Sequence, residues 1–181
     1  MGIIDFFKSK SKKQEPDILS ELTLGKLKVG YLLDYDMKTW EVTGYNYYDW
    51  RGVISHEWQL KSDQESVYLE MESDDETYFT LSRTIPFNRL GQKVKTHILD
   101  TGDPPETIVY DGVTYHLEVT GAGYFYKDGK GPAQELISWT YADEKDSKNL
   151  NIEQWGENDF EASTGISVEE YQFTNILPRQ I

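Results

Sequence analysis

The sequence predicts an all-β protein made of two fused copies of a small antiparallel meander, a pseudo-two-fold sandwich or barrel-like fold preceded by a short N-terminal amphipathic segment. Strand-length runs of alternating apolar and polar residues recur about every 8–12 residues, separated by charged or glycine-containing turns. No long segment has the periodicity of a helix. The second half of the chain also repeats the first, which is why we expect two copies that share one core.

The repeat is visible without gaps between residues 58–85 and 139–166, which share eight identical pairs in 28 positions. These pairs are Trp58/Trp139, Ser66/Ser147, Leu69/Leu150, Glu72/Glu153, Glu76/Glu157, Phe79/Phe160, Ser82/Ser163 and Ile85/Ile166. Upstream, Tyr35-Asp36 and Val42-Thr43-Gly44 recur in the same order as Tyr110-Asp111 and Val119-Thr120-Gly121. Because most repeated residues are of core or turn type, the repeat predicts architecture rather than chemistry.

The expected elements follow from this pattern. Residues 17–178 form the duplicated β domain, with copy one over 24–90 and copy two over 106–178. In copy one, alternation predicts strands at 27–31, 40–47, 58–60, 67–72 and 79–81, with a polar loop over 49–55. In copy two it predicts strands at 115–119, 137–141, 150–152, 160–162 and 171–173. Thr101 to Pro105 is read as a rigid connector between the copies.

Composition excludes several classes of site. The formal charge of −14 disfavours a nucleic-acid partner, because phosphate binding needs clustered Lys and Arg. The chain has no cysteine, so disulfides, thiol nucleophiles and cysteine-based zinc sites are excluded. No run approaches the roughly 20 apolar residues of a membrane span. We therefore expect a cytoplasmic protein.

Residues 1–16 form a separate basic amphipathic head and linker. An apolar start followed directly by lysines can lie weakly in an anionic headgroup region. The candidate membrane-contact residues are Ile3, Ile4, Phe6, Phe7, Lys8, Lys10, Lys12 and Lys13. The alternatives are a disordered tail and a helix docked on its own domain.

No catalytic residue, metal ligand or cofactor site is predicted. His56, His97 and His116 fall in different predicted elements and lack acidic ligand spacing. Glu72 and Glu153 are the remaining candidate pair for a carboxylate-dependent hydrolase, because both copies retain them. Duplication alone explains the pair, with each glutamate an outward strand residue or a structural hydrogen-bond acceptor.

A ligand or partner surface is predicted where two aromatic segments follow the repeated Val-Thr-Gly. Its residues are Tyr45, Tyr47, Tyr48, Trp50, Tyr124, Phe125 and Tyr126. Aromatic faces flanked by carboxylates favour cations, so a polyamine or a basic peptide would suit such a surface. The alternative is cross-strand packing of the tyrosines.

Across about residues 24–178 the chain resembles the bacterial family catalogued as domain of unknown function 4178. In the first half the resemblance lies in Leu27-Lys28-Val29-Gly30-Tyr31, Trp40-Glu41-Val42-Thr43-Gly44, Trp58-Gln59-Leu60 and Tyr68-Leu69-Glu70. In the second half it lies in Tyr110-Asp111-Gly112-Val113-Thr114-Tyr115, Trp139-Thr140-Tyr141 and Leu150-Asn151-Ile152-Glu153. The resemblance implies a soluble accessory protein of the kind encoded beside phage-shock-type membrane-stress proteins, small membrane proteins and polyamine-synthesis enzymes. It carries over no catalytic residue.

The leading expectation is a non-enzymatic adaptor in a stress-related system, acting on a protein partner near the cytoplasmic membrane, with weak anionic-lipid contact and a peripheral position at the inner membrane. The alternative is a cation-binding module that uses the aromatic and acidic residues. The hydrolase is the remote third reading.

Overall fold

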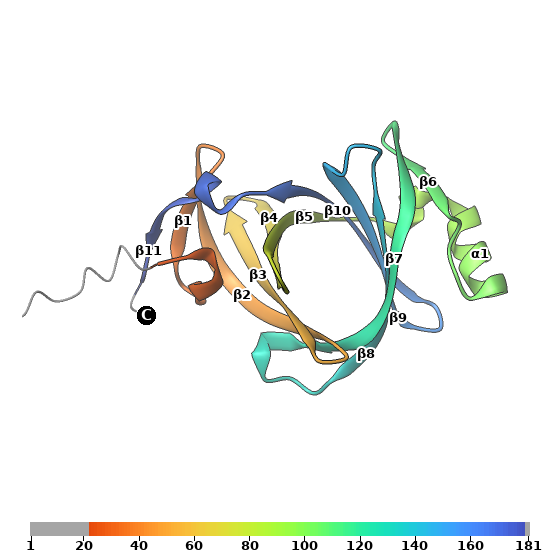
Figure 1. The fold of residues 1–181 in the computed structure, drawn as a ribbon, viewed down its shortest axis with the longest axis horizontal. Helices are drawn as coiled ribbons and strands as arrows, with labels where there is room; N and C mark the ends of the chain where they lie inside the picture. Colours follow the sequence, from red (N-terminus) through yellow and green to blue (C-terminus); the bar gives the residue numbers. More distant parts are fainter. Residues whose placement is uncertain (1–21, 180–181) are drawn as a thin grey trace, which may run out of the picture.

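The computed structural model describes residues 22–179, in which eleven strands form one antiparallel sheet (Figure 1). The strands are β1 (Leu32–Tyr35), β2 (Lys38–Trp50), β3 (Val53–Ser62), β4 (Glu65–Ser73), β5 (Thr77–Ile85), β6 (Thr107–Tyr110), β7 (Val113–Tyr126), β8 (Gln134–Ala142), β9 (Lys148–Gly156), β10 (Asp159–Val168) and β11 (Thr174–Leu177). The helical elements of this range are α1 (Gln92–Thr101) and the short 3-10 turns η2 (Leu24–Lys26), η3 (Phe87–Leu90), η4 (Lys127–Gly129) and η5 (Glu170–Gln172). The predicted all-β antiparallel fold is therefore confirmed.

Eight of the eleven strands in this range close into a ring. The order runs β2-β3-β4-β5-β10-β9-β8-β7, and a further pairing of β7 with β2 completes the circle. Figure 1 looks almost along the axis of this ring, with β1 and β11 on one side and β6 and α1 on the other. Closure gives every ring strand an inner face and an outer face, because successive side chains point to opposite sides of a sheet.

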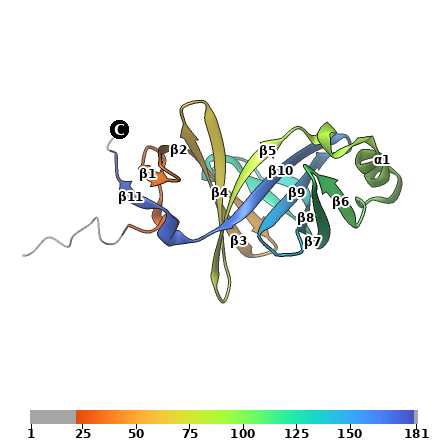
Figure 2. The ribbon, with the colours of Figure 1, turned by 90° about the horizontal axis from the view of Figure 1, so that it is seen from above.

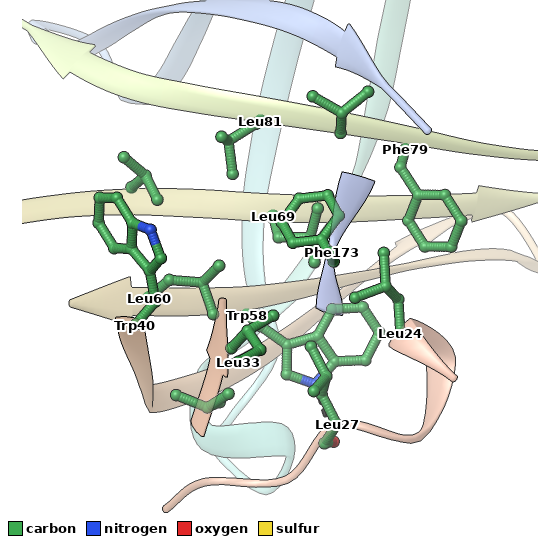
Figure 3. Close-up of a cluster of buried hydrophobic side chains, with 13 residues drawn as sticks. Leu24, Leu27, Leu33, Trp40, Trp58, Leu60, Leu69, Phe79, Leu81 and Phe173 are labelled. Atoms are coloured by element: carbon green, nitrogen blue, oxygen red, sulfur yellow. Dashed lines mark hydrogen bonds between the residues drawn. The ribbon is translucent and has the colours of Figure 1, made fainter. Parts of the chain in front are cut away.

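Most of the buried apolar residues of the ring lie on its outer face, in two separate clusters. One centres on Trp58, Leu60 and Leu69 and is covered by η2, β1 and the segment around Phe173 (Figure 3). The other centres on Trp139 and Ile152 and is covered by η3, α1 and β6. Figure 2, turned by 90° from Figure 1, shows these covering elements at opposite ends of the molecule.

Each cluster is completed by the segment that follows the last ring strand of the other half. Leu90, Val94 and Ile98, which follow β5, pack in the cluster of the second half. Phe173 and Ile176, which follow β10, pack against the cluster of the first half, where β11 also pairs with β1. Each half therefore depends on the other for its core, because neither half alone supplies all the apolar side chains that bury its own tryptophan.

The two seams between the halves have a symmetric register. In the β2–β7 seam, Tyr47 is opposite Tyr126 and Asp49 is opposite Tyr124. Counted from the repeated Val-Thr-Gly, Tyr47 corresponds to Tyr124 and Asp49 corresponds to Tyr126. Exchanging each residue for its counterpart therefore converts one of these pairs into the other. The β5–β10 seam behaves in the same way under the ungapped alignment, with Ser82 opposite Gly165 and Thr84 opposite Ser163. The register has the two-fold relation that the repeat predicts, while the origin of the chain by duplication stays a prediction.

Four local expectations are wrong. The closing strand expected at 171–173 is instead the 3-10 turn η5, and β11 starts only at Thr174. Residues 27–31 are not a strand, because Gly30 (φ 92°) turns the chain, and the pairing of β1 with β2 starts only at Leu32. Residues 49–55 are not a loop, because Arg51 and Gly52, with φ of 60° and 101°, join β2 and β3 in a two-residue turn.

Helix α1 was not predicted from the sequence pattern. It buries only Val94 and Ile98, four residues apart, so ten residues give too little periodic signal to be recognised. Gly102, in the left-handed conformation (φ 90°), ends the helix by donating its N–H to the carbonyl of Ile98 at 2.8 Å. The head, residues 1–16, lies outside the described residues, so its predicted membrane contacts have no structural counterpart here.

Candidate functional site

The inner face of the ring lines a cavity of about 840 Å³ that is open to solvent. All eight ring strands contribute side chains to its lining. The acidic lining residues are Glu57, Glu70, Glu135, Glu153, Asp159 and Glu161; the aromatic ones are Tyr48, Tyr68, Phe125 and Trp155. Lys127 is the one cationic side chain among the lining residues that the structure describes. The lumen is thus polar and strongly acidic, whereas the apolar clusters lie outside it.

Two β-bulges set which side chains of the seam strands face the cavity. The register of β2 against β3 shifts between Val42 and Gly44. Val42 before the shift belongs to the outer cluster, whereas Tyr48 after it lines the cavity, although both are even-numbered. A matching shift between Leu117 and Val119 turns β7 in the same way. An extra residue reverses the alternation of a strand, so the bulges carry the aromatic ends of β2 and β7 into the lumen.

Glu57 on β3 is held by neutral donors. The Asn46 side-chain amide donates to Glu57 Oε1 at 2.8 Å, and the Tyr48 hydroxyl approaches Glu57 Oε2 at 3.5 Å. Asn46 is itself oriented by the backbone N–H of Asp128, which donates to Asn46 Oδ1 at 3.0 Å. Burial raises the pKa of Glu57, and the hydrogen bonds from Asn46 and Tyr48 oppose that rise.

Glu70 on β4 lies at the end of a short hydrogen-bond chain. The Trp50 indole N–H donates to Ser55 Oγ at 3.0 Å, and Ser55 Oγ donates to Glu70 Oε1 at 3.0 Å. Burial, with the charges of Glu72 and Glu57, raises the pKa of Glu70 to about 8, although the Ser55 hydrogen bond acts in the opposite direction. This carboxyl therefore holds its proton through most of the neutral range.

Glu153 on β9, in the second half, also accepts a hydrogen bond from a neutral side chain. The Asn151 side-chain amide donates to Glu153 Oε1 at 3.3 Å, and the Ser138 hydroxyl fixes Asn151 by donating to its Oδ1 at 2.8 Å. Burial, followed by the charges of Glu57 and Glu161, raises the pKa of Glu153 to about 8. Two carboxyls from different halves are therefore protonated in the same cavity near neutral pH.

Aromatic side chains form part of the same wall. Phe125 makes an edge contact with Trp155 at a ring-centroid distance of 5.2 Å, and Tyr48 is tilted against Phe125 at 5.0 Å. The indole N–H of Trp155 is buried and finds no hydrogen-bond partner among residues 22–179. An unpartnered buried donor is uncommon in a folded protein and here lies in a cavity wall.

The structure brings the predicted aromatic surface together and divides it between two faces. The β2–β7 seam places Tyr47 in stacked contact with Tyr126, with ring centroids 4.4 Å apart. Tyr48 and Phe125 line the cavity, and Trp50 stacks on Tyr48 at 5.3 Å. Tyr45 instead packs against the outer cluster.

The remaining predicted residues are also placed outside the lumen. Tyr45 contacts His56, with 2.7 Å between the hydroxyl and Nδ1, and Tyr124 is 42% exposed. Cross-strand packing, the alternative expected from the sequence, therefore accounts for Tyr45 and for the Tyr47–Tyr126 pair. The role of the set in ligand binding stays a prediction.

The two glutamates of the remote hydrolase reading differ in position. Glu153 lines the cavity, whereas Glu72, near the end of β4, does not belong to the lining. Of the two structural roles expected for Glu153, the outward strand residue is wrong, because closure of the sheet turns that face inward. Its hydrogen bond from Asn151 agrees with the other expected role, a hydrogen-bond acceptor. No group of three or more His, Asp or Glu side chains within residues 22–179 is arranged to hold a metal ion.

Sequence reasoning missed Glu57, Glu70 and Glu161 as parts of one site. The signal was present in the alternation: Glu57 precedes Trp58, and Glu70 follows Leu69, so each glutamate is on the face opposite a core residue. In an open sheet that face would be in solvent. Only the β2–β7 pairing, which joins residues distant in sequence, makes it the wall of a cavity.

Comparison with known proteins gives a family and no activity. Residues 28–170 match the model of a family described as domain of unknown function (DUF4178). An uncharacterized protein of Aquifex aeolicus (strain VF5) is 30% identical over 183 residues, which cover 99% of this chain and 100% of that protein. No solved structure matches this fold. Among residues 22–179, no helix has the length and apolarity to cross a membrane. The chain belongs to the family described as domain of unknown function (DUF4178).

Proposed function

We propose that this protein binds an organic cation inside its strand ring, with a polyamine or a basic peptide side chain as the ligand class. The observation that carries the proposal is a cavity of about 840 Å³ whose lining holds six acidic side chains and one lysine. Its volume lies in the range of small-molecule sites in proteins, roughly 300–1,000 Å³. The site is far larger than a single metal ion requires.

The chemistry of the wall suits ammonium groups. Glu57, Glu70 and Glu153 accept hydrogen bonds from neutral side chains, so these partners bring no positive charge that would compete with an incoming ammonium group. Aromatic faces such as those of Tyr48 and Trp155 add cation–π attraction of roughly 0.5–2 kcal/mol per contact. Because the carboxyls come from β3, β4, β9 and β10, an elongated cation with several ammonium groups can meet more of them than a monovalent one.

Isothermal titration with spermidine tests the proposal. We expect saturable binding at about pH 8, weakened roughly tenfold or more in Glu57→Gln and in Glu153→Gln, because an ion pair with the ammonium group is replaced by a hydrogen bond to a neutral amide. The matched control is Glu144→Gln, which makes the same charge change in the turn after β8. Absence of binding, or equal weakening in the control variant, would exclude the cavity as the cation site.

The adaptor role expected from the sequence stays a second proposal. It depends on residues 1–13, which lie outside the described residues, and on a family context that names no activity. Co-sedimentation of the full chain and of a chain lacking residues 1–13 with anionic vesicles tests it, and salt-sensitive binding by the full chain alone is the expected result. The hydrolase reading has less support, because Glu72 is not among the cavity-lining residues.

A further inference from the structure

The carboxyls of the lumen are crowded enough to influence one another's ionisation. The charges of Glu72, Glu57 and Glu153 contribute to the raised pKa of Glu70. The charges of Glu57 and Glu161 contribute to the raised pKa of Glu153. These side chains come from four strands on both halves of the ring, so the cluster extends across the cavity. Like charges in a partly desolvated space cannot all be ionised at low cost, and one or more of them keeps its proton.

The other groups that face the cluster do not neutralise it. The titratable or charged side chains from the surrounding elements are Tyr48 of β2, Tyr68 of β4, Lys127 of η4, Glu135 of β8 and Asp159 of β10. Burial raises the pKa of both tyrosines, so they stay neutral hydroxyls at physiological pH. Two of the remaining three are acids, and Lys127 is exposed to solvent. Protons, rather than internal ion pairs, thus limit the negative charge of the lumen in the free protein.

We propose that the cavity exchanges protons for its ligand: each ammonium group that enters pairs with a glutamate carboxylate and displaces that carboxyl's proton to solvent. This inference rests on the proposed cation-binding function. Charge is conserved in each exchange, because a neutral carboxylic acid and a free ammonium ion give a carboxylate–ammonium pair and one released proton. Glu70 and Glu153 are the two exchange groups.

The exchange makes binding depend on pH with a defined sign. Both carboxyls have their pKa raised to about 8 by burial and neighbouring charge in the free protein. An ammonium partner favours the ionised form and lowers the pKa in the complex. Affinity then increases with pH between the bound and free values, by up to about tenfold per pH unit for each exchanging carboxyl. Acidification promotes ligand release.

Proton release is measurable by calorimetry. We would titrate the full chain with 1,4-diaminobutane at about pH 7, where both amines are protonated as lysine amines are. Repeating this in phosphate and in Tris, which differ in ionisation enthalpy, gives the number of protons released per ligand. The expected value is between about one and two, lowered by up to one in Glu70→Gln and in Glu153→Gln and unchanged in Glu144→Gln.

The outcomes separate this inference from the function on which it rests. Binding with the same heat in both buffers would overturn proton exchange and leave cation binding in place. Absence of binding in both buffers would overturn the proposed function. The protonated state is then tested without ligand by carbon-13 NMR of the glutamate carboxyls, assigned by the two Gln variants. Titration midpoints near 8 for Glu70 and Glu153 are expected, and midpoints at the ordinary glutamate value would overturn the inference.

Discussion

The two halves of the ring have the same core residues on their outer face but differ in the positions of the acidic residues on their inner face. Outside, Trp58 corresponds to Trp139 and Leu69 to Leu150, and all four are buried. Inside, three acidic cavity residues correspond to uncharged residues in the other half, whereas Glu153 corresponds to Glu72. The pairs are Glu57 with Ser138, Glu70 with Asn151, and Thr80 with Glu161. The outer positions determine the fold of both halves, while each half contributes its own carboxyls to one shared cavity.

The largest expected effect comes from the outer tryptophans. Trp58 is 2% exposed and Trp139 is fully buried, so each change to alanine leaves a large void and should cost roughly 3–5 kcal/mol of the free energy of unfolding. Chemical denaturation measures this. The matched control is Trp155→Ala on the partly exposed inner face, which should cost clearly less. A loss in Trp155→Ala as large as that in Trp58→Ala would remove the distinction between the two faces.

A smaller effect is expected at the β2–β7 seam. A Cβ on Gly123 would lie 2.6 Å from Trp50 Cε3 and 2.7 Å from the backbone oxygen of Asp49, so Gly123→Ala should cost roughly 1–3 kcal/mol. A Cβ on Gly121 would meet the same ring at an ordinary 3.5 Å, which makes Gly121→Ala the control. Equal thermal stability of the two variants would contradict the close packing of this seam.

The carboxyls of the inner face should make the free energy of unfolding depend on pH. The pKa of Glu70 is about 8 in the folded protein and higher than in the unfolded chain, so its stabilising contribution is complete below the unfolded value and is lost as the pH rises through 8. Glu70→Gln imitates the protonated acid. We expect it to match the wild type in unfolding free energy at about pH 5 and to exceed it at about pH 9. Parallel pH profiles of the two proteins would refute a buried, protonated Glu70.

The smallest effect is expected for the stacked pair Tyr47 and Tyr126 on the outside of the seam. A double-mutant cycle to alanine should give a coupling of about 0.5–1.5 kcal/mol, the usual contribution of an aromatic pair beyond its buried area. Denaturation of the four proteins measures it. Zero coupling would mean that the rings do not stack in solution.

The sequence predicted the parts of this fold that depend on local pattern. Alternation around Trp58 and Trp139 identified the strands. The two aromatic segments that follow the repeated Val-Thr-Gly meet in the β2–β7 seam, where Tyr48 contacts Phe125. Alternation separates the faces of a strand without telling which face is enclosed. The position of Glu57 in a cavity follows from ring closure, a contact between distant residues that carries no local signal.

The segments that follow β5 and β10 each pack in the cluster of the opposite half, and this could not be predicted from the sequence for a similar reason. Val94 and Phe173 are ordinary apolar residues in their own segments, and nothing local indicates that each packs in the cluster of the opposite half. The sequence also assigned the apolar side of each strand to one shared core. In the structure that side is divided into two outer clusters, and the polar side is shared.

The location of the bound cation is the most direct test of the account. The indole N–H signals of the five tryptophans can be followed by proton–nitrogen NMR while spermidine is added. Trp155 lines the cavity, whereas Trp40, Trp58 and Trp139 belong to the outer clusters. The account predicts a saturable shift of the Trp155 signal with the three outer signals unchanged. Saturable shifts confined to the outer tryptophans, or no shift at all, would contradict it.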